Sequence, residues 1–194
     1  GIKKIRSLVK DYDQPFTLSC FISGHYLDKN HWYRNSDEGT RVCGNIGHWL
    51  DLATHILFWR KLIVSYIDIS INYSDINTPS DNITISLTSS NNDLISIVFS
   101  TRSEPFEGVT ETINFQQDKL IAKIDDHRYT TIWQEEKKYK LKNRVKNVGH
   151  KNAIMQPFTE KNERRWEELN ISTNLMLTVT DMVKNNSKFY KFHL

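Results

Sequence analysis

The sequence predicts an α+β domain, built as a large, mostly antiparallel open β-sheet with helices packed on one face. Between Leu62 and Lys142, short stretches alternate apolar and polar residues, with tight polar turns between them. Tight turns indicate antiparallel neighbours, because parallel strands need long crossovers. Helical spacing of apolar residues recurs near the start, around residue 50 and near the end of the chain. We therefore expect the other sheet face to stay open to solvent or to a second copy.

The first segment, IKKIRSLVKDY from Ile2 to Tyr12, predicts an amphipathic helix that ends ahead of Pro15. FTLSCFIS, from Phe16 to Ser23, is short, aromatic and β-branched, and predicts a buried strand. Gly1 precedes this helix without an initiator Met. We therefore expect the chain to be a piece of a longer protein.

The stretch from His31 to Arg60 contains the candidate site. The polar loop Gly24 to Thr40 is rich in His, Trp, Tyr and Arg, and loops of this length in compact domains tend to be functional. Apolar residues at helical spacing then predict a helix from Ile46 to Leu57. His48 and Asp51 lie three residues apart and hence on one side of it.

The remaining elements are predicted in the same way, strands from alternating apolar and polar residues and helices from apolar residues at a spacing of three and four. Ile83 to Leu87 and Leu94 to Ser100 form the clearest predicted hairpin, across the turn SSNND. The segment 184–194 has no period, so we expect a domain over 1–183 and a C-terminal tail over 184–194. The other expected strands are 62–73, 111–115, 120–124, 129–133 and 138–142, and the expected C-terminal helices are 152–158, 161–169 and 171–183, the last with Asn170 or Ser172 as its cap.

Composition narrows the function classes. Lys and Arg number 26 against 23 Asp and Glu, a net charge of +3 that does not favour nucleic acid. No apolar run approaches the roughly 20 residues of a membrane span. Cys20 and Cys43 fit a reduced, cytoplasmic chain, and His31 and His48 lack a third ligand at metal spacing. We therefore expect no nucleic acid, no membrane and no metal.

Several motifs together resemble the C-terminal domain of the Gfo/Idh/MocA oxidoreductases, the glucose-fructose oxidoreductase and inositol dehydrogenase family. GHYLDKNHWYRNSDEGTRVCGNIGHWLDL is similar to a family branch that reads, loosely, D-H-W and then E-G-G-x-R-I-x-G-E-x-C-H-F-x-D-L. ETINFQQDKLIAKIDD resembles a strand, turn and strand of the family sheet, and GHKNAIMQPF its K-G-H helix start. The resemblance implies an open sheet whose free face commonly serves oligomerisation, so we expect a homo-oligomer.

The resemblance also implies a reaction: hydride transfer between NAD(P) and a sugar-like carbon, with His48 as the acid/base. Imidazole suits this role, because it titrates near neutral pH. The alternative is that His48 caps or packs at the helix start. Asp51 matches the family's helix Asp, for which we favour a structural role. Residues expected to bind the sugar, sugar nucleotide or cyclitol are His31, Trp32, Tyr33, Arg34, Arg41 and Asn45.

For these residues structural alternatives remain open. Trp32 and Tyr33 would either stack on a sugar or anchor the loop to the sheet. Arg34 and Arg41 would either bind substrate, including a diphosphate, or, for Arg41, pair with Asp37 or Glu38.

The chain also departs from the family pattern. Many members carry Asp where this chain has Gly44, and the closest branch carries Glu where it has Asn45, which cannot take up a proton. The second Gly of the E-G-G run is Thr40. These departures leave open an inactive member or one of altered specificity.

The sequence contains no G-x-G-x-x-G turn and no E-K-P segment, which the family uses for its cofactor. We therefore expect the substrate-binding and oligomerisation part of a dehydrogenase, which is inactive alone and binds NAD or NADP only with its own N-terminal Rossmann domain. No cofactor is expected on this fragment. The rival hypothesis is a non-catalytic sheet domain that binds a carbohydrate or a protein partner.

Overall fold

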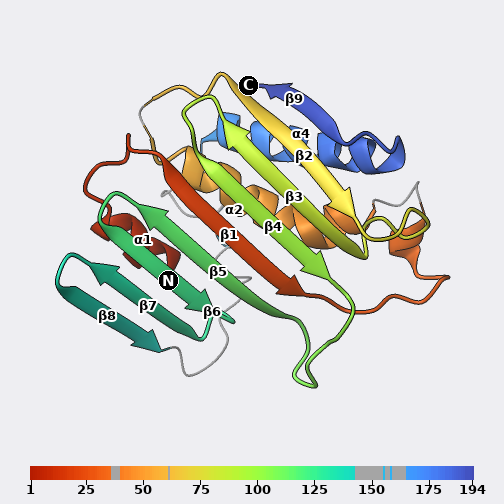
Figure 1. Cartoon of the computed structure of the whole chain (residues 1–194), viewed down its shortest axis with the longest axis horizontal. Helices are drawn as coiled ribbons and strands as arrows, with labels where there is room; N and C mark the ends of the chain where they lie inside the picture. The colour runs from red at the N-terminus through yellow and green to blue at the C-terminus, as the bar shows by residue number, and fades with distance from the viewer. Residues whose placement is uncertain (36–39, 61, 143–154, 156–157, 159–164) are drawn as a thin grey trace.

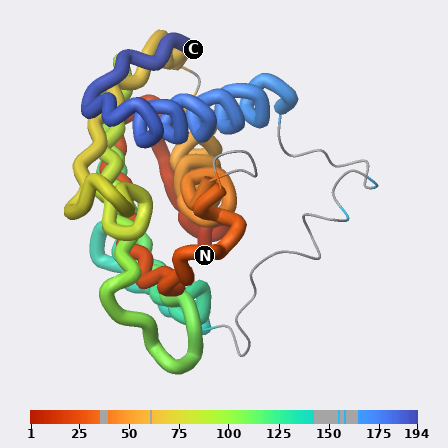
Figure 2. Tube along the Cα trace, turned by 90° about the vertical axis from the view of Figure 1, so that its right-hand side faces the viewer, coloured from red at the N-terminus to blue at the C-terminus, as the bar shows by residue number. Residues whose placement is uncertain are grey.

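The computed structural model describes residues 1–35, 40–60, 62–142, 155, 158 and 165–194. A nine-stranded sheet has the order β8-β7-β6-β5-β1-β4-β3-β2-β9. Helices α1, α2 and α4 all lie on one side of this sheet (Figures 1 and 2). The predicted α+β class with an open, one-sided sheet is confirmed.

Most strands begin and end close to the predicted positions, whereas helix α1 ends at Leu8, four residues before the predicted end at Tyr12, because the backbone is already extended at Val9. Strands β1 and β4 match the sequence-based ranges, and most other strands differ by at most two residues at either end. The elements are α1 (Ile2–Leu8), β1 (Phe16–Ser23), the 3₁₀ helix η1 (Trp32–Arg34), the π-helix η2 (Val42–Ile46), α2 (Gly47–Leu57), β2 (Tyr66–Tyr73), β3 (Asn82–Ser89), β4 (Leu94–Ser100), β5 (Thr110–Gln117), β6 (Leu120–Asp125), β7 (Tyr129–Gln134), β8 (Lys137–Lys142), α4 (Trp166–Lys184) and β9 (Phe189–His193).

Strand β2 was expected from Leu62, but it starts only at Tyr66. The apolar side chain of Ile63 is 85% exposed, so the alternation read from the sequence does not reflect burial there. The ladder begins where Tyr66 meets His193 of β9, because strand pairing rather than periodicity fixes the boundary.

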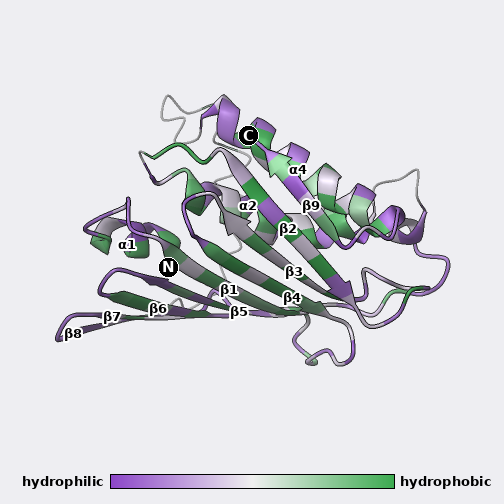
Figure 3. Ribbon diagram, turned by 45° about the horizontal axis from the view of Figure 1, so that its top comes forward, coloured by the Kyte–Doolittle hydropathy of each residue, from purple (hydrophilic) through white to green (hydrophobic). Residues whose placement is uncertain are grey.

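Neighbouring strands pair antiparallel except at the centre of the sheet. There β1 and β4 run parallel, with Cys20 opposite Ile97. The predicted hairpin of β3 and β4 is confirmed, with Ile85 opposite Ile97. Hydrophobic and hydrophilic residues alternate along the strands (Figure 3), and most of the apolar ones are buried on the face that the helices cover. Cys20 is completely buried there, and burial raises the pKa of its thiol to about 12.

The C-terminal part differs from the expected pair of helices with a cap between them. A single helix, α4, starts at Trp166 and passes through Asn170 and Ser172 without a break. Ser172 does not cap, because its hydroxyl bonds Asp51 of α2 at 2.6 Å. The expected helix over 152–158 and the start of 161–169 fall almost wholly outside the described residues.

The segment 184–194, which was expected to be a C-terminal tail, contributes a strand to the sheet. Residues Phe189–His193 form β9, which pairs antiparallel with β2 at the edge of the sheet. Only Phe192 of this strand is buried, so the sequence shows no alternation there.

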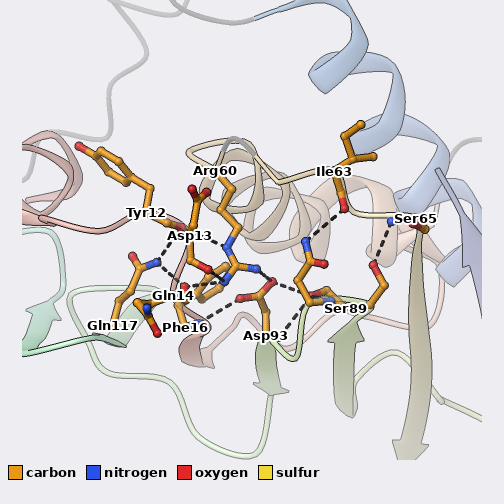
Figure 4. A network of polar contacts seen from close by, with 12 residues as sticks. Tyr12, Asp13, Gln14, Phe16, Arg60, Ile63, Ser65, Ser89, Asp93 and Gln117 are labelled. Atoms are coloured by element: carbon orange, nitrogen blue, oxygen red, sulfur yellow. Dashed lines mark hydrogen bonds and ion pairs between the residues drawn. The ribbon is translucent and has the colours of Figure 1, made fainter.

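A buried ion pair joins the end of α2 to the sheet. Arg60 Nη1 donates to Asp93 Oδ2 at 2.7 Å, and the two side chains are 1% and 0% exposed. The same guanidinium donates to the backbone carbonyls of Tyr12, Asp13 and Gln14, just before β1 (Figure 4).

Both carboxylate oxygens of Asp93 accept hydrogen bonds in this network. Its carboxylate also accepts from the backbone N–H of Phe16 at 3.0 Å and from the hydroxyl of Ser89. The ion pair therefore ties three segments together: the end of α2, the entry to β1 and the β3–β4 turn.

Candidate functional site

The candidate helix starts with a π-helical turn. The π-helix η2 runs directly into α2, and π-turns inside helices occur frequently at functional sites. The apolar face of this helix is buried against the sheet, as expected from its spacing. The buried apolar residues are Ile46, Trp49, Leu50, Ala53, Ile56 and Leu57.

His48 lies on the opposite, exposed side of the helix. Its ring touches Trp49 edge-on, with centroids 6.0 Å apart. Within the described part of the chain, the imidazole makes no hydrogen bond or ion pair, unlike His55, whose Nδ1 lies 2.9 Å from Glu168. The imidazole is therefore exposed and accessible to a ligand, with one ring edge against Trp49.

Three rings from the loop form a compact cluster. Trp32 and Tyr33 have centroids 4.0 Å apart, and His31 stacks on Trp32 at 5.8 Å. His31 Nδ1 also accepts the backbone N–H of Tyr33 at 3.1 Å, as the N-cap of η1. Trp32 remains 52% exposed, so one aromatic surface faces solvent.

Tyr33 joins this loop to the helix start. Its hydroxyl lies 3.4 Å from the carbonyl of Gly44. A Cβ placed on Gly44 would be 2.3 Å from Cζ of the Tyr33 ring. Residue 44 therefore has to be glycine for this approach, which accounts physically for one departure from the family pattern.

Arg34 and Arg41 are held by a carboxylate that sequence reasoning missed. Arg34 Nη2 donates to Asp81 Oδ2 at 2.9 Å, and Arg41 Nε lies 3.3 Å from Asp81 Oδ1. Asp81 precedes β3, and it is 6% exposed. Its only sequence signal was its position as a turn residue before an alternating strand.

The remaining guanidinium donors bind the loop backbone. Arg41 donates to the carbonyl of His25 from both Nη atoms at 2.9 Å, and Arg34 donates to the carbonyls of Leu27 and Asp28. Arg41 is 2% exposed, and burial lowers the pKa of its guanidinium. In this geometry both arginines anchor the backbone of the loop. The other partners weighed for Arg41, Asp37 and Glu38, fall outside the described residues.

Asn45 and Asp51 take different positions on the helix. Asn45 is half-buried in the π-turn, and its amide makes no hydrogen bond within the described residues. Asp51 accepts the hydroxyl of Ser172, in keeping with a structural role.

Helices α2 and α4 meet along a regular polar seam. Every fourth residue from Cys43 faces every fourth residue back from Thr180, as two antiparallel i, i+4 rows. The seam fixes the helix that carries His48. The facing pairs are Cys43 with Thr180 at 3.3 Å, Gly47 with Met176, Asp51 with Ser172 at 2.6 Å and His55 with Glu168 at 2.9 Å.

Two further features concern the described part of the chain. It contains no group of three or more His, Cys, Asp or Glu side chains placed to hold a metal ion. None of its helices combines the length and apolar character that a membrane crossing requires.

Comparison with known proteins gives structural matches only. No family model and no curated protein matches the sequence. A candidate oxidoreductase from Thermotoga maritima superposes with a TM-score of 0.73 at 11% identity, over 99% of this chain and 58% of that one. The dehydrogenase MviM from Clostridium difficile gives 0.65 at 13% identity, over 92% and 57%.

The fold is not restricted to proteins named as dehydrogenases. A super-repressor mutant of Gal80p from Saccharomyces cerevisiae matches with a TM-score of 0.64 at 14% identity, over 99% of this chain and 61% of that one. In each of these comparisons this chain spans less than two thirds of the neighbour's length. The chain therefore has the fold of the C-terminal domain of the Gfo/Idh/MocA-type oxidoreductases.

Proposed function

We propose that this chain is the substrate-binding and oligomerisation part of an NAD(P)-dependent oxidoreductase acting on a sugar, sugar nucleotide or cyclitol, with His48 as acid/base. The observation that carries this proposal is the exposed imidazole, unbonded within the described residues, at the start of α2. The names of the dehydrogenases that share the fold support the reaction class.

The chemistry assigned to the chain itself is the proton transfer. The substrate hydroxyl gives its proton to the His48 imidazole, a side chain that serves commonly as a general base. Trp32 offers an exposed ring for stacking on a sugar, His31 supports that ring, and the amide of Asn45 is available for a substrate hydroxyl.

The cofactor is assigned to another domain. This chain contains no G-x-G-x-x-G turn to hold a dinucleotide. When bound to an N-terminal Rossmann domain, oxidised NAD(P) would act as the hydride acceptor. We expect the chain alone to be inactive, and calorimetry showing micromolar binding of NAD(H) or NADP(H) to it would contradict this division of labour.

His48→Ala is the test of the reaction, made in the whole protein that carries this domain. UDP-N-acetylglucosamine is the first probe, because it is named for GnnA from Acidithiobacillus ferrooxidans, which shares the fold with a TM-score of 0.62. We expect NAD(P)-dependent oxidation to fall by about 10²–10⁴-fold, the usual contribution of a positioned acid/base.

The matched control is His127→Ala, on the β6–β7 turn, where the imidazole lies 3.0 Å from Glu111. Its activity should equal that of the unmodified protein. Activity of His48→Ala within tenfold of that level would remove His48 from the mechanism.

The open sheet face is proposed to bind a second copy of the chain. Facing residues in register across β1, β4, β3 and β2 form a row of serines, Ser19, Ser96, Ser86 and Ser70. Such a row lets another sheet approach closely, and Phe21 and Leu94 beside it are 50% and 51% exposed.

Ser96→Arg should therefore convert a dimer or larger oligomer into monomers, because a charge would be buried at the centre of the contact. Sedimentation velocity measures the change, with Asn174→Arg on exposed α4 as the control. A monomeric unmodified protein at about 100 μM, or an unchanged oligomer in Ser96→Arg, would refute this contact.

Two expectations complete the proposal. Cys20 and Cys43 are free thiols, which fits a reduced cytoplasmic setting. The second candidate function is a non-catalytic domain that binds a carbohydrate or a protein. It is favoured by the occurrence of the fold in Gal80p, whose matched structure is described as a super-repressor mutant and not as a dehydrogenase. Probe binding without turnover in the whole protein would support this second function.

A further inference from the structure

The position of the Tyr33 hydroxyl links the loop to the face of the helix that carries His48. A Cβ on Gly44 would be 2.3 Å from Cζ and 2.6 Å from the hydroxyl oxygen of Tyr33. The polar end of the phenol therefore occupies the space that a side chain of residue 44 would take.

Gly44 and His48 are four residues apart in a continuous helical segment. Side chains at this spacing lie on one face of a helical segment, about one turn apart. The phenol hydroxyl and the imidazole consequently lie on the same helix face, about one turn from each other.

The ring of Tyr33 is held in place, but its hydroxyl group makes only a long, weak hydrogen bond. Packing against Trp32 and the Gly44 backbone holds the ring. The contact of its hydroxyl with the Gly44 carbonyl is 3.4 Å, well beyond the roughly 2.7–2.8 Å of a strong O–H···O bond. The O–H group can therefore turn to a better acceptor when one arrives.

We propose that Tyr33 is a second catalytic residue, which holds the same substrate hydroxyl as His48. This inference rests on the proposed function. The hydroxyl O–H bond breaks and its proton goes to the imidazole, while the electron pair forms the carbonyl as hydride leaves the carbon for oxidised NAD(P). Tyr33 donates a hydrogen bond to that oxygen as negative charge develops on it.

Tyr33→Phe in the whole protein tests the assignment, with UDP-N-acetylglucosamine and NAD(P) as the probe. We expect kcat/KM to fall by about 10²-fold, as for loss of one preorganised donor. The shape of the pH–rate profile should stay unchanged, because the acid/base remains in place. Tyr26→Phe is the matched control, because Tyr26 lies in the same loop and is 65% exposed.

Gly44→Ala supplies a second, independent variant. Its Cβ would displace the phenol, so its loss should match that of Tyr33→Phe. In a Tyr33→Ala background the same substitution should cost less than about twofold, because no ring remains to be displaced. Equal losses in both backgrounds would mean that Gly44 serves only the π-turn, which would overturn the inference.

The outcomes separate the two proposals. Inactive His48→Ala with Tyr33→Phe within twofold of the unmodified protein overturns the role of Tyr33 and leaves His48 in place. An active His48→Ala, or no turnover in the unmodified protein, overturns the proposed function for this probe and the inference with it. Loss of activity in both His48→Ala and Tyr33→Phe supports both the proposed function and the role of Tyr33.

Discussion

Replacing Arg60 by methionine is expected to lower the free energy of unfolding by about 3–5 kcal/mol, the usual effect of leaving a buried charge unpaired. Methionine keeps much of the packing volume while removing the charge. Asp93 would then remain completely buried without its counter-ion. The backbone carbonyls of Tyr12 and Gln14 would lose a donor in the same step. Urea denaturation followed by circular dichroism measures the change.

The pH dependence separates lost charge pairing from lost packing. Burial raises the pKa of the Asp93 carboxyl, so the folded state binds a proton there more tightly than the unfolded state does. In Arg60→Met this difference grows, and stability relative to the unmodified protein should recover as the pH falls from 7 towards 4. A deficit independent of pH would indicate packing alone.

The control for Arg60 is an exposed ion pair. Arg128 Nε lies 3.1 Å from Asp126 Oδ2, with the arginine side chain 44% exposed. Arg128→Ala should change stability by less than about 1 kcal/mol, because solvent screens such pairs. A similar loss of unfolding free energy in Arg60→Met and Arg128→Ala would show that burial does not make the Arg60–Asp93 pair more important for stability than an exposed pair.

Asp81→Asn is expected to have the second large effect, again about 3–5 kcal/mol, because it leaves Arg41 buried without a counter-charge. Arg34 loses its charged partner in the same change. Since both arginines anchor the backbone of the loop, amide hydrogen exchange should rise over residues 25–34 and stay low in β1. Mass spectrometry of deuterium uptake measures both segments at once.

Asp75→Asn is the matched control, six residues away in the same connection between β2 and β3. Asp75 is exposed and caps its own turn through the backbone N–H of Asn77. Its substitution should leave exchange in the loop unchanged. Unchanged exchange in Asp81→Asn as well would show that the loop is held by other contacts.

Where the strands lie was largely predictable from the sequence. The alternation in FTLSCFIS and LISIVFS set β1 and β4 correctly, because side chains on a strand point to opposite faces and one face is buried. The helix of the candidate site followed in the same way from its apolar spacing. His48 was predicted on that helix, and its exposure agrees with its absence from the apolar stripe.

Roles that depend on distant partners were not predictable. Arg34 and Arg41 share a carboxylate partner, Asp81, which lies 47 residues beyond Arg34 in the sequence. Periodicity carries no information about which charges meet across a fold. The Tyr33–Gly44 contact and the seam between α2 and α4 are of the same kind.

The sequence by itself determined the class of fold, most strand positions and the helix that presents His48, because these depend on local patterns of burial. Only the tertiary structure decided the parallel pairing of β1 with β4, the edge strand β9, the anchoring of the arginines and the contact of the Tyr33 phenol with Gly44. Each of these features forms between segments that are distant in the sequence. The free energy of each contact depends on which residues the fold brings together, and local sequence patterns do not reveal that.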